Sequence, residues 1–162
     1  LIAAQPKDLE TSEIEVRLGA TWFDKKYIEQ FMYETFETPR YLRGQIEISY
    51  VPYTAEWQVS RKSMVRYNDV AAFTTYGTDR ASAYRLLEDA LNLRDIRIYD
   101  TIEDADGRER RVLNAKETTL AAQKQQLIRD AFKDWIWKDP ERRETLVRQY
   151  ASMTAATSFS PV

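Results

Sequence analysis

The side chains that could do chemistry in this sequence are carboxylates, amines and hydroxyls, because its 162 residues include no histidine and no cysteine. Their absence excludes disulfides, thiolate nucleophiles, histidine or cysteine zinc sites and imidazole acid–base catalysis. Hydrophobic residues make up 43% of the chain and aromatic residues 12%, which is too apolar for a disordered segment. We therefore expect a folded chain with a narrow choice of reactive groups.

Carboxylates could form a metal-dependent nuclease site if they gathered on strand ends beside a lysine. Glu47 and Glu56 could lie near each other across a hairpin, and Asp24 precedes Lys26. The pattern favours the alternative, in which these residues form a hydrated strand face and a helix cap. No metal ligand and no catalytic residue is assigned from them, and the four scattered glycines form neither a dinucleotide fingerprint nor a P-loop.

Basic residues in the C-terminal third are the first candidate nucleic-acid contact. Arg142 and Arg143 fall in the first turn of the last predicted helix, where cations oppose the helix dipole, and this indicates a role other than helix stability. The lysines lie off the apolar stripe of the preceding helix. The candidate residues are Lys124, Lys133, Trp137, Lys138, Arg142 and Arg143. The alternative is a hydrated helical face in which Glu141 and Glu144 pair with them.

A basic and aromatic loop is the second candidate nucleic-acid contact. Its basic residues are Arg61, Lys62 and Arg66, and they are accompanied by Tyr67, Tyr76 and Arg80. Such loops can follow a phosphate backbone and stack bases on their aromatic rings. The alternative is a charged loop that stays hydrated.

The formal net charge is -2, from 24 basic and 26 acidic residues, so bulk charge does not indicate a nucleic-acid binder. The charge is uneven along the chain. Residues 1–60 carry 6 basic and 10 acidic side chains, whereas residues 108–162 carry 11 and 7. We expect any polyanionic partner to meet the C-terminal third.

The elements that position these residues follow from periodicity and from capping signals. The capping box of Ser12 and Glu15 predicts a helix over about 12–18, and a second helix is predicted between Asp24 and Pro39.

Residues 45–60 alternate between apolar and polar side chains, which predicts a hairpin. A loop over 52–55 would pair Tyr50 with Trp57. We expect 61–77 to be the longest irregular connection. The further predicted elements are a helix from Thr78 to about Leu91, a hairpin from Ile96 through Asp106 and Gly107 to Val112, a helix over about 115–138 opened by Asn114, and a last helix beginning at Asp139 and Pro140.

This order predicts an α+β fold with two antiparallel hairpins, about five helices and a mainly helical C-terminal half. We expect residues 1–150 to form a single domain and 151–162 to be a flexible tail or linker. No apolar run approaches the roughly 20 residues that cross a bilayer, so we expect a cytoplasmic chain with no membrane partner.

Several phrases of the sequence resemble one region of known proteins. They are LGATW at 18–22, YIEQFMYE at 27–34, YTAEW at 53–57, TYGT at 75–78, VLNAKET at 112–118, FKDWI at 132–136 and DPERR at 139–143. They resemble the segment between the adenine-N6 DNA methylase module and the SNF2-like helicase module in very large proteins of bacterial conjugative elements and phages, related to phage antirestriction proteins. The resemblance covers roughly 6–150.

This resemblance implies a role in handling DNA, a mobile genetic element as host, and the methylase and helicase modules as neighbours in the same chain. ATP and S-adenosylmethionine would be cofactors of the parent protein, and none is implied for this chain. The methylase and helicase motifs are absent here, so no catalytic residue is carried over. After Tyr150 the chain continues Ala-Ser-Met-Thr-Ala-Ala, which departs from the family's continuation into the helicase.

The leading hypothesis is a non-catalytic accessory domain that positions DNA or couples the two modules. A structural protein-interaction module, with an apolar patch near Trp22, Phe23 or Trp137, is the alternative. A carboxylate-metal enzyme is the third, and it requires at least three converging acids.

Overall fold

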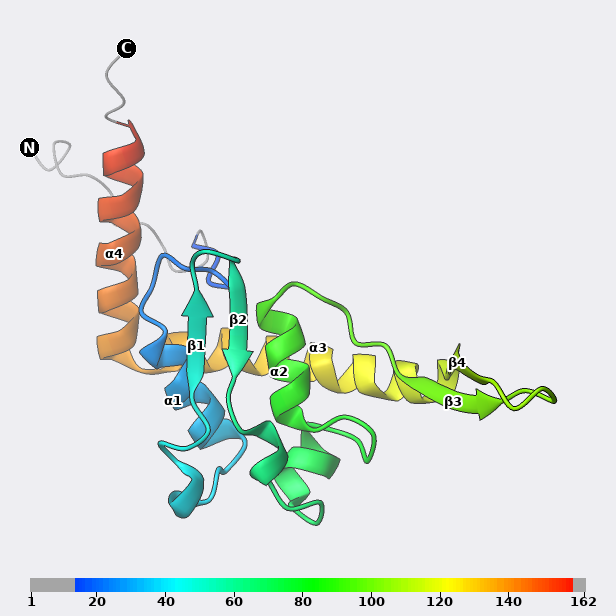
Figure 1. Cartoon of the computed structure of the whole chain (residues 1–162). Coiled ribbons are helices and arrows are strands. Elements are labelled where there is room, and N and C mark those ends of the chain that lie inside the picture. Colours follow the sequence, from blue (N-terminus) through cyan, green and yellow to red (C-terminus); the bar gives the residue numbers. More distant parts are fainter. Residues whose placement is uncertain (1–13, 159–162) are drawn as a thin grey trace, which may run out of the picture.

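Two antiparallel hairpins and a set of helices give the chain an α+β fold, which confirms the predicted class (Figure 1). The computed structural model describes the backbone of residues 14–158 and the side chains of 14–155. Its α-helices are α1 (Lys26–Thr35), α2 (Ala83–Leu91), α3 (Ala115–Lys138) and α4 (Pro140–Ser158). Its strands are β1 (Ile48–Val51), β2 (Glu56–Val59), β3 (Tyr99–Glu103) and β4 (Glu109–Leu113). Short turns of 3-10 helix, η3 (Arg40–Leu42) and η4 (Lys62–Met64), and a π-helix, η5 (Ala71–Thr75), complete this range.

Helix α3 is the element on which α1, α2 and α4 all pack. The Asn114 side chain accepts a hydrogen bond from the backbone N–H of Glu117 at 3.0 Å, so the predicted cap at the start of α3 is confirmed. Ile128, Phe132 and Ile136 recur every four residues and are buried, which gives the helix one apolar face toward the core. None of the described helices is long and apolar enough to span a membrane.

The β1–β2 hairpin has the predicted register, with Tyr50 opposite Trp57. Side chains from two helices satisfy the backbone groups along its outer edges. On the β1 edge, the backbone N–H of Ile48 donates to the Glu29 carboxylate at 3.0 Å. On the β2 edge, the backbone N–H of Val59 donates to Glu88 at 2.8 Å, and the N–H of Trp57 donates to the Asn92 side chain at 2.7 Å. The hairpin is therefore held between α1 and α2 without any further strand.

The β3–β4 hairpin, which we call the arm (99–113), projects away from the body of the molecule beside the start of α3 (Figure 1). Its turn is closed by a hydrogen bond from the N–H of Gly107 to the carbonyl of Asp104 at 2.9 Å, and Gly107 has the positive φ of 79° that such turns favour in glycine. Ile96 and Ile98, which precede β3, are buried, but most of the arm is exposed.

The predicted helix over 12–18 is wrong from residue 14 onward, and Ser12 lies outside the described residues. Residues 14–17 belong to no helix, and the side chains of Ile14, Val16 and Leu18 are buried in alternation. This period of two suits β-branched residues in an extended strand-like segment better than a helix. Gly19 then turns the chain with φ of 94°, and a Cβ there would lie 2.4 Å from the Leu91 carbonyl oxygen.

Two helix boundaries and the buried face of one helix also differ from prediction. Helix α2 begins after Ser82, whose hydroxyl accepts from the N–H of Arg85 at 3.3 Å, while Thr78 closes a separate turn before it. Leu120 and Leu127, which the apolar pattern of the sequence places on the buried face of α3, are exposed. Helix α4 continues through 151–158, where we had expected a flexible tail or linker, because this stretch contains three alanines, the strongest helix formers.

We predict that Gln125→Leu lowers the free energy of unfolding by about 2 kcal/mol, because it leaves buried backbone groups without a partner. The Gln125 side chain is buried; it accepts from the N–H of Ile96 at 3.1 Å and donates to the carbonyl of Arg94 at 2.9 Å. Urea unfolding followed by circular dichroism measures the change. Gln126→Leu, at the exposed neighbouring position, should change it by less than about 0.5 kcal/mol; equal losses at both positions would contradict the proposed role.

Candidate nucleic-acid interface

Arg142 and Arg143 bind the C-terminal end of α3. The Arg142 guanidinium lies over the Trp135 ring, 3.7 Å from its centroid, and donates to the Trp135 carbonyl at 2.7 Å. Arg143 donates to the Trp137 carbonyl at 2.8 and 3.1 Å. Carbonyls in the last turn of a helix lack intrahelical partners, and cations are favourable there. The inference that these arginines have a role other than helix stability is therefore corrected, since they stabilise the junction of α3 and α4.

The remaining candidates of the C-terminal group do not form one surface. Lys124 donates to the carbonyl of Thr75 at 3.3 Å. Lys133, nine residues later, lies on the opposite side of α3, because nine residues make two and a half turns. Lys133 and Lys138 are exposed with no ion pair among the described residues, and Trp137 is partly buried against the core.

Three residues of the second candidate group, Arg61, Lys62 and Arg80, line a pocket that we call the basic hollow. It has a volume of about 460 Å³, and four of its lining residues are the cations Arg61, Lys62, Arg80 and Arg85. Asp79 is the acid among its lining residues, and Val59, Val65 and Phe73 supply apolar wall. The structure therefore brings together cations of two separate segments, which are the turn after β2 and the stretch 79–85, where the turn before α2 leads into its first turn.

Local backbone geometry places these cations. Arg61 has a positive φ of 55°, which reverses the chain after β2 and lets η4 follow at once. Arg80 lies in the turn closed by Thr78 and Ala81. Arg85 is in the first turn of α2, and its guanidinium donates to the Arg80 carbonyl at 3.2 Å. Sequence reasoning missed Arg85, although the Ser82 cap three residues earlier is a signal that could have placed it.

Part of this positive charge is balanced within the chain. Lys62 forms an ion pair with Glu88 at 2.7 Å, and Arg80 forms one with Asp100 at 2.7 Å. Arg61 and Arg85 have no ion pair among the described residues, and Arg61 makes only a long hydrogen bond of 3.4 Å to Gln45. The hollow consequently keeps an excess of positive charge.

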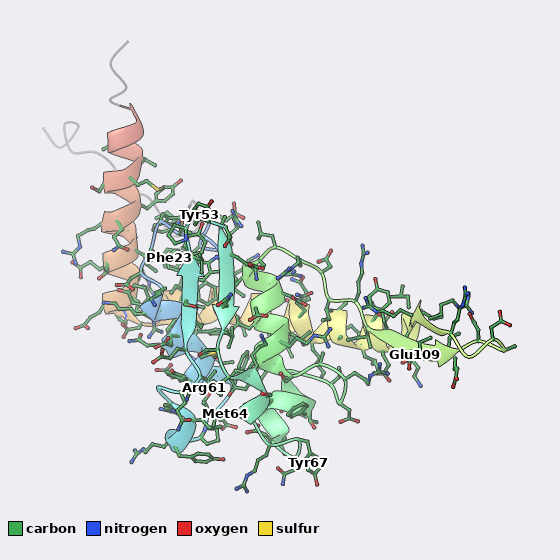
Figure 2. The ribbon with its side chains drawn as sticks, in the orientation of Figure 1. Phe23, Tyr53, Arg61, Met64, Tyr67 and Glu109 are labelled. Atoms are coloured by element: carbon green, nitrogen blue, oxygen red, sulfur yellow. The ribbon has the colours of Figure 1, made fainter. Side chains whose placement is uncertain are left out.

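Exposed side chains extend the surface beside the hollow. Tyr67 is 87% exposed and Arg66 is also exposed, without an ion pair in the described part of the chain. Figure 2 shows Arg61, Met64 and Tyr67 toward the end of the molecule opposite Tyr53, which stands at the tip of the β1–β2 hairpin. Tyr76, also predicted for this surface, is partly buried against Phe36. Tyr67 follows Val65, a lining residue of the hollow, by two positions, so an exposed aromatic ring lies near the hollow along the chain.

The carboxylate pair does not assemble. Glu56 lies opposite Val51, whereas Glu47 lies at the other end of the hairpin, where its carbonyl accepts from Ser60. Among the described residues, no group of three or more acidic side chains is placed to hold a metal ion. The possible nuclease pairing of Glu47 with Glu56 is therefore wrong.

The most strongly perturbed tyrosine is buried in the core. Tyr84 is fully buried, and its hydroxyl shares a hydrogen bond of 2.6 Å with that of Thr38. Burial raises the pKa of Tyr84 to about 12. A neutral hydroxyl without access to solvent serves packing, so Tyr84 adds nothing to the surface chemistry.

Comparison with known proteins gives a family match. A family model described as a domain of unknown function, DUF8437, matches residues 17–154. No curated protein and no solved structure matches the chain. The matched range includes every residue of the basic hollow.

We predict that Arg142→Ala lowers the free energy of unfolding by about 1–2 kcal/mol, because it removes a cation–π contact and a charge-assisted hydrogen bond to the end of α3. Arg143→Ala should cost less, since Arg143 is exposed. Chemical denaturation measures both. Lys133→Ala, at an exposed position before the last turn of α3, is the matched control and should change stability by less than about 0.5 kcal/mol; a loss equal to that of Arg142→Ala would disprove the capping role.

We predict that Asp100 stabilises the fold above about pH 4 and loses this effect in acid. Hydrogen bonds from Arg80 and then Asn114 lower the pKa of the Asp100 carboxyl, so the folded state binds its proton less readily than the unfolded state. The contribution is fully present above the unfolded pKa of about 3.9 and is lost as pH falls through the lower folded pKa. The difference in unfolding free energy between the native chain and Asp100→Asn, measured from pH 7 to 2, should be constant and then shrink. A difference independent of pH would contradict this.

Proposed function

Because the chain belongs to the DUF8437 family, a domain of unknown function, we propose a function from its geometry: it is a non-catalytic accessory domain that contacts DNA through the basic hollow. The observation that carries the proposal is the convergence of Arg61, Lys62, Arg80 and Arg85 on one pocket. These cations come from two segments that are separate in the sequence, 61–62 and 80–85, so their concentration is a property of the fold.

The chemistry of the hollow suits a phosphate backbone. Arginine and lysine contacts to phosphate supply most of the sequence-independent affinity for nucleic acid. The exposed ring of Tyr67 offers a surface on which a base of a single strand can stack. Arg66, next to it in the sequence, supplies a cation for the adjoining phosphate. The proposed preference is therefore for single-stranded DNA.

The placement of the contact differs from the hypothesis that put it on the last two helices. There, Arg142 and Arg143 hold the end of α3, and Lys124 and Lys133 point to opposite sides. In the basic hollow, by contrast, four cations line one pocket. The resemblance to the segment between methylase and helicase modules supports DNA as the partner class, and positioning DNA for those neighbouring modules is part of the same proposal.

The arm favours a second candidate function, a protein-interaction module that couples neighbouring domains. Ile102 and Val112 lie on one face of the arm and are each 39% exposed. A two-stranded hairpin alone is marginally stable in water, so a partner on this face would stabilise it. The other location suggested for such a patch, near Trp22, Phe23 or Trp137, gives less support, because Phe23 is buried and both tryptophans pack partly against the core.

We predict that the chain binds a fluorescent oligothymidine with a dissociation constant of about 10⁻⁴ to 10⁻⁶ M, weakening with salt. The triple variant Arg61→Gln, Arg66→Gln, Arg85→Gln should bind at least tenfold more weakly in fluorescence anisotropy. It should also lower the slope of log affinity against log salt by about 2, since each phosphate contact in a single strand contributes about 0.7.

A variant with the same change in net charge provides the control. Lys116→Gln, Lys133→Gln, Lys138→Gln removes three cations from α3 and should retain the native affinity and slope. Equal weakening of DNA binding by both triple variants would show that only net charge matters. The absence of binding at low salt would overturn the DNA contact and favour the second candidate function, a protein-interaction module that uses the arm.

A further inference from the structure

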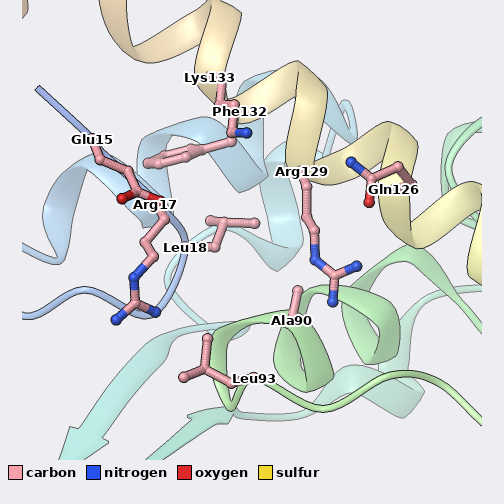
Figure 3. A pocket seen from close by; sticks show the side chains of 9 residues that line it. All are labelled: Glu15, Arg17, Leu18, Ala90, Leu93, Gln126, Arg129, Phe132 and Lys133. Carbon is pink, nitrogen blue, oxygen red and sulfur yellow. The ribbon is translucent and has the colours of Figure 1, made fainter. Parts of the chain in front are cut away.

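A second hollow lies on another part of the surface, between the segment 15–18, the end of α2 and the middle of α3. Figure 3 shows it from close by, with Arg17 on one side of Leu18 and Arg129 on the other. Its volume is about 170 Å³, which is below the usual range for pockets that hold drug-sized ligands. We call it the α2–α3 hollow, and its size suits a small molecule.

The floor of the α2–α3 hollow is apolar. Leu18, Ala90 and Phe132 line it, and all three belong to the buried core. Leu93, which follows α2, adds an exposed apolar side chain at its edge. Apolar floors of this kind hold the hydrocarbon part of a ligand, while a few polar groups fix its orientation.

The rim of the hollow carries three cations and one acid. They are Arg17, Arg129, Lys133 and Glu15. Arg129 pairs with Asp95 at 3.4 Å, but the Asp95 side chain is 88% exposed, and exposed pairs of this kind contribute little. Arg17 and Lys133 have no ion pair among the described residues, and Glu15 forms none with them. The rim is therefore left positively charged in a chain whose net charge is -2.

We propose that the α2–α3 hollow binds a small organic carboxylate whose apolar body rests on Leu18, Ala90 and Phe132. Arginine guanidinium groups match a carboxylate in shape and can donate two hydrogen bonds to it. Arg129 is the principal anchor because it rises from α3 and is partly buried. Arg17 and Lys133 assist it from the rim.

This site is independent of the proposed contact with DNA. It shares no lining residue with the basic hollow, and a phosphodiester chain has no apolar body for its floor. Either proposal can fail while the other stands.

The test uses benzoate as the probe and the whole chain, labelled with ¹⁵N, in amide NMR spectra. Benzoate should shift the amide signals of Leu18, Ala90 and Phe132 in a saturable manner. Arg129→Gln should weaken binding at least tenfold and Arg17→Gln several-fold, whereas Lys116→Gln, on a distant part of α3, should leave it unchanged. A melting curve of each variant shows that it folds.

Two comparisons make the test decisive. Benzyl alcohol, which has the ring without the charge, should bind at least tenfold more weakly than benzoate. Gln126→Phe, at an exposed position that lines the hollow, should cover it and abolish the benzoate shifts while the melting temperature is kept. Equal binding of benzyl alcohol, shifts spread over unrelated basic residues, or unchanged binding by Arg129→Gln would each overturn the proposal.

Discussion

The fold depends on how the two-stranded β1–β2 sheet obtains hydrogen-bond partners for the backbone groups along its two outer edges. In the β1–β2 hairpin, Ile48 and Val59 are register partners, and their N–H groups point outward to Glu29 on α1 and Glu88 on α2. Unpaired backbone groups in a half-buried position are costly, so the hairpin needs a helix on each side. Both helices then rest on α3, and the basic hollow forms where β2 turns away toward α2.

Much of the fold could be predicted from the sequence, because the capping and alternation signals act on residues that are close in the sequence. Asn114 opens α3 and Asp139 opens α4 through contacts three residues away. Alternation together with a four-residue loop over 52–55 predicted the pairing of Tyr50 with Trp57. The segment after residue 13 could not be predicted in this way. There the capping signal of Glu15 was overridden by burial of alternate side chains against distant elements.

The candidate site was harder to predict from the sequence, because the acidic partner of a cation is often distant in the sequence. Lys62 pairs with Glu88, 26 residues away, and Arg80 with Asp100, 20 residues away. For Arg142 the helix-dipole rule was applied to the helix that contains it, whereas its guanidinium lies at the end of the preceding helix. Composition identifies the basic residues, but only the folded structure shows which of them have no acidic partner and can contact a ligand.

The side-chain caps on the β1–β2 hairpin also have a consequence for synthesis of the chain on the ribosome. Glu29 is made before β1, but Glu88 and Asn92 follow Val59 by 29 and 33 residues. At about 5–20 residues per second the β2 edge stays open for roughly 2–7 s. An open edge is a template for pairing with other chains, so the nascent protein is most exposed to aggregation in that interval, until α2 emerges and closes it.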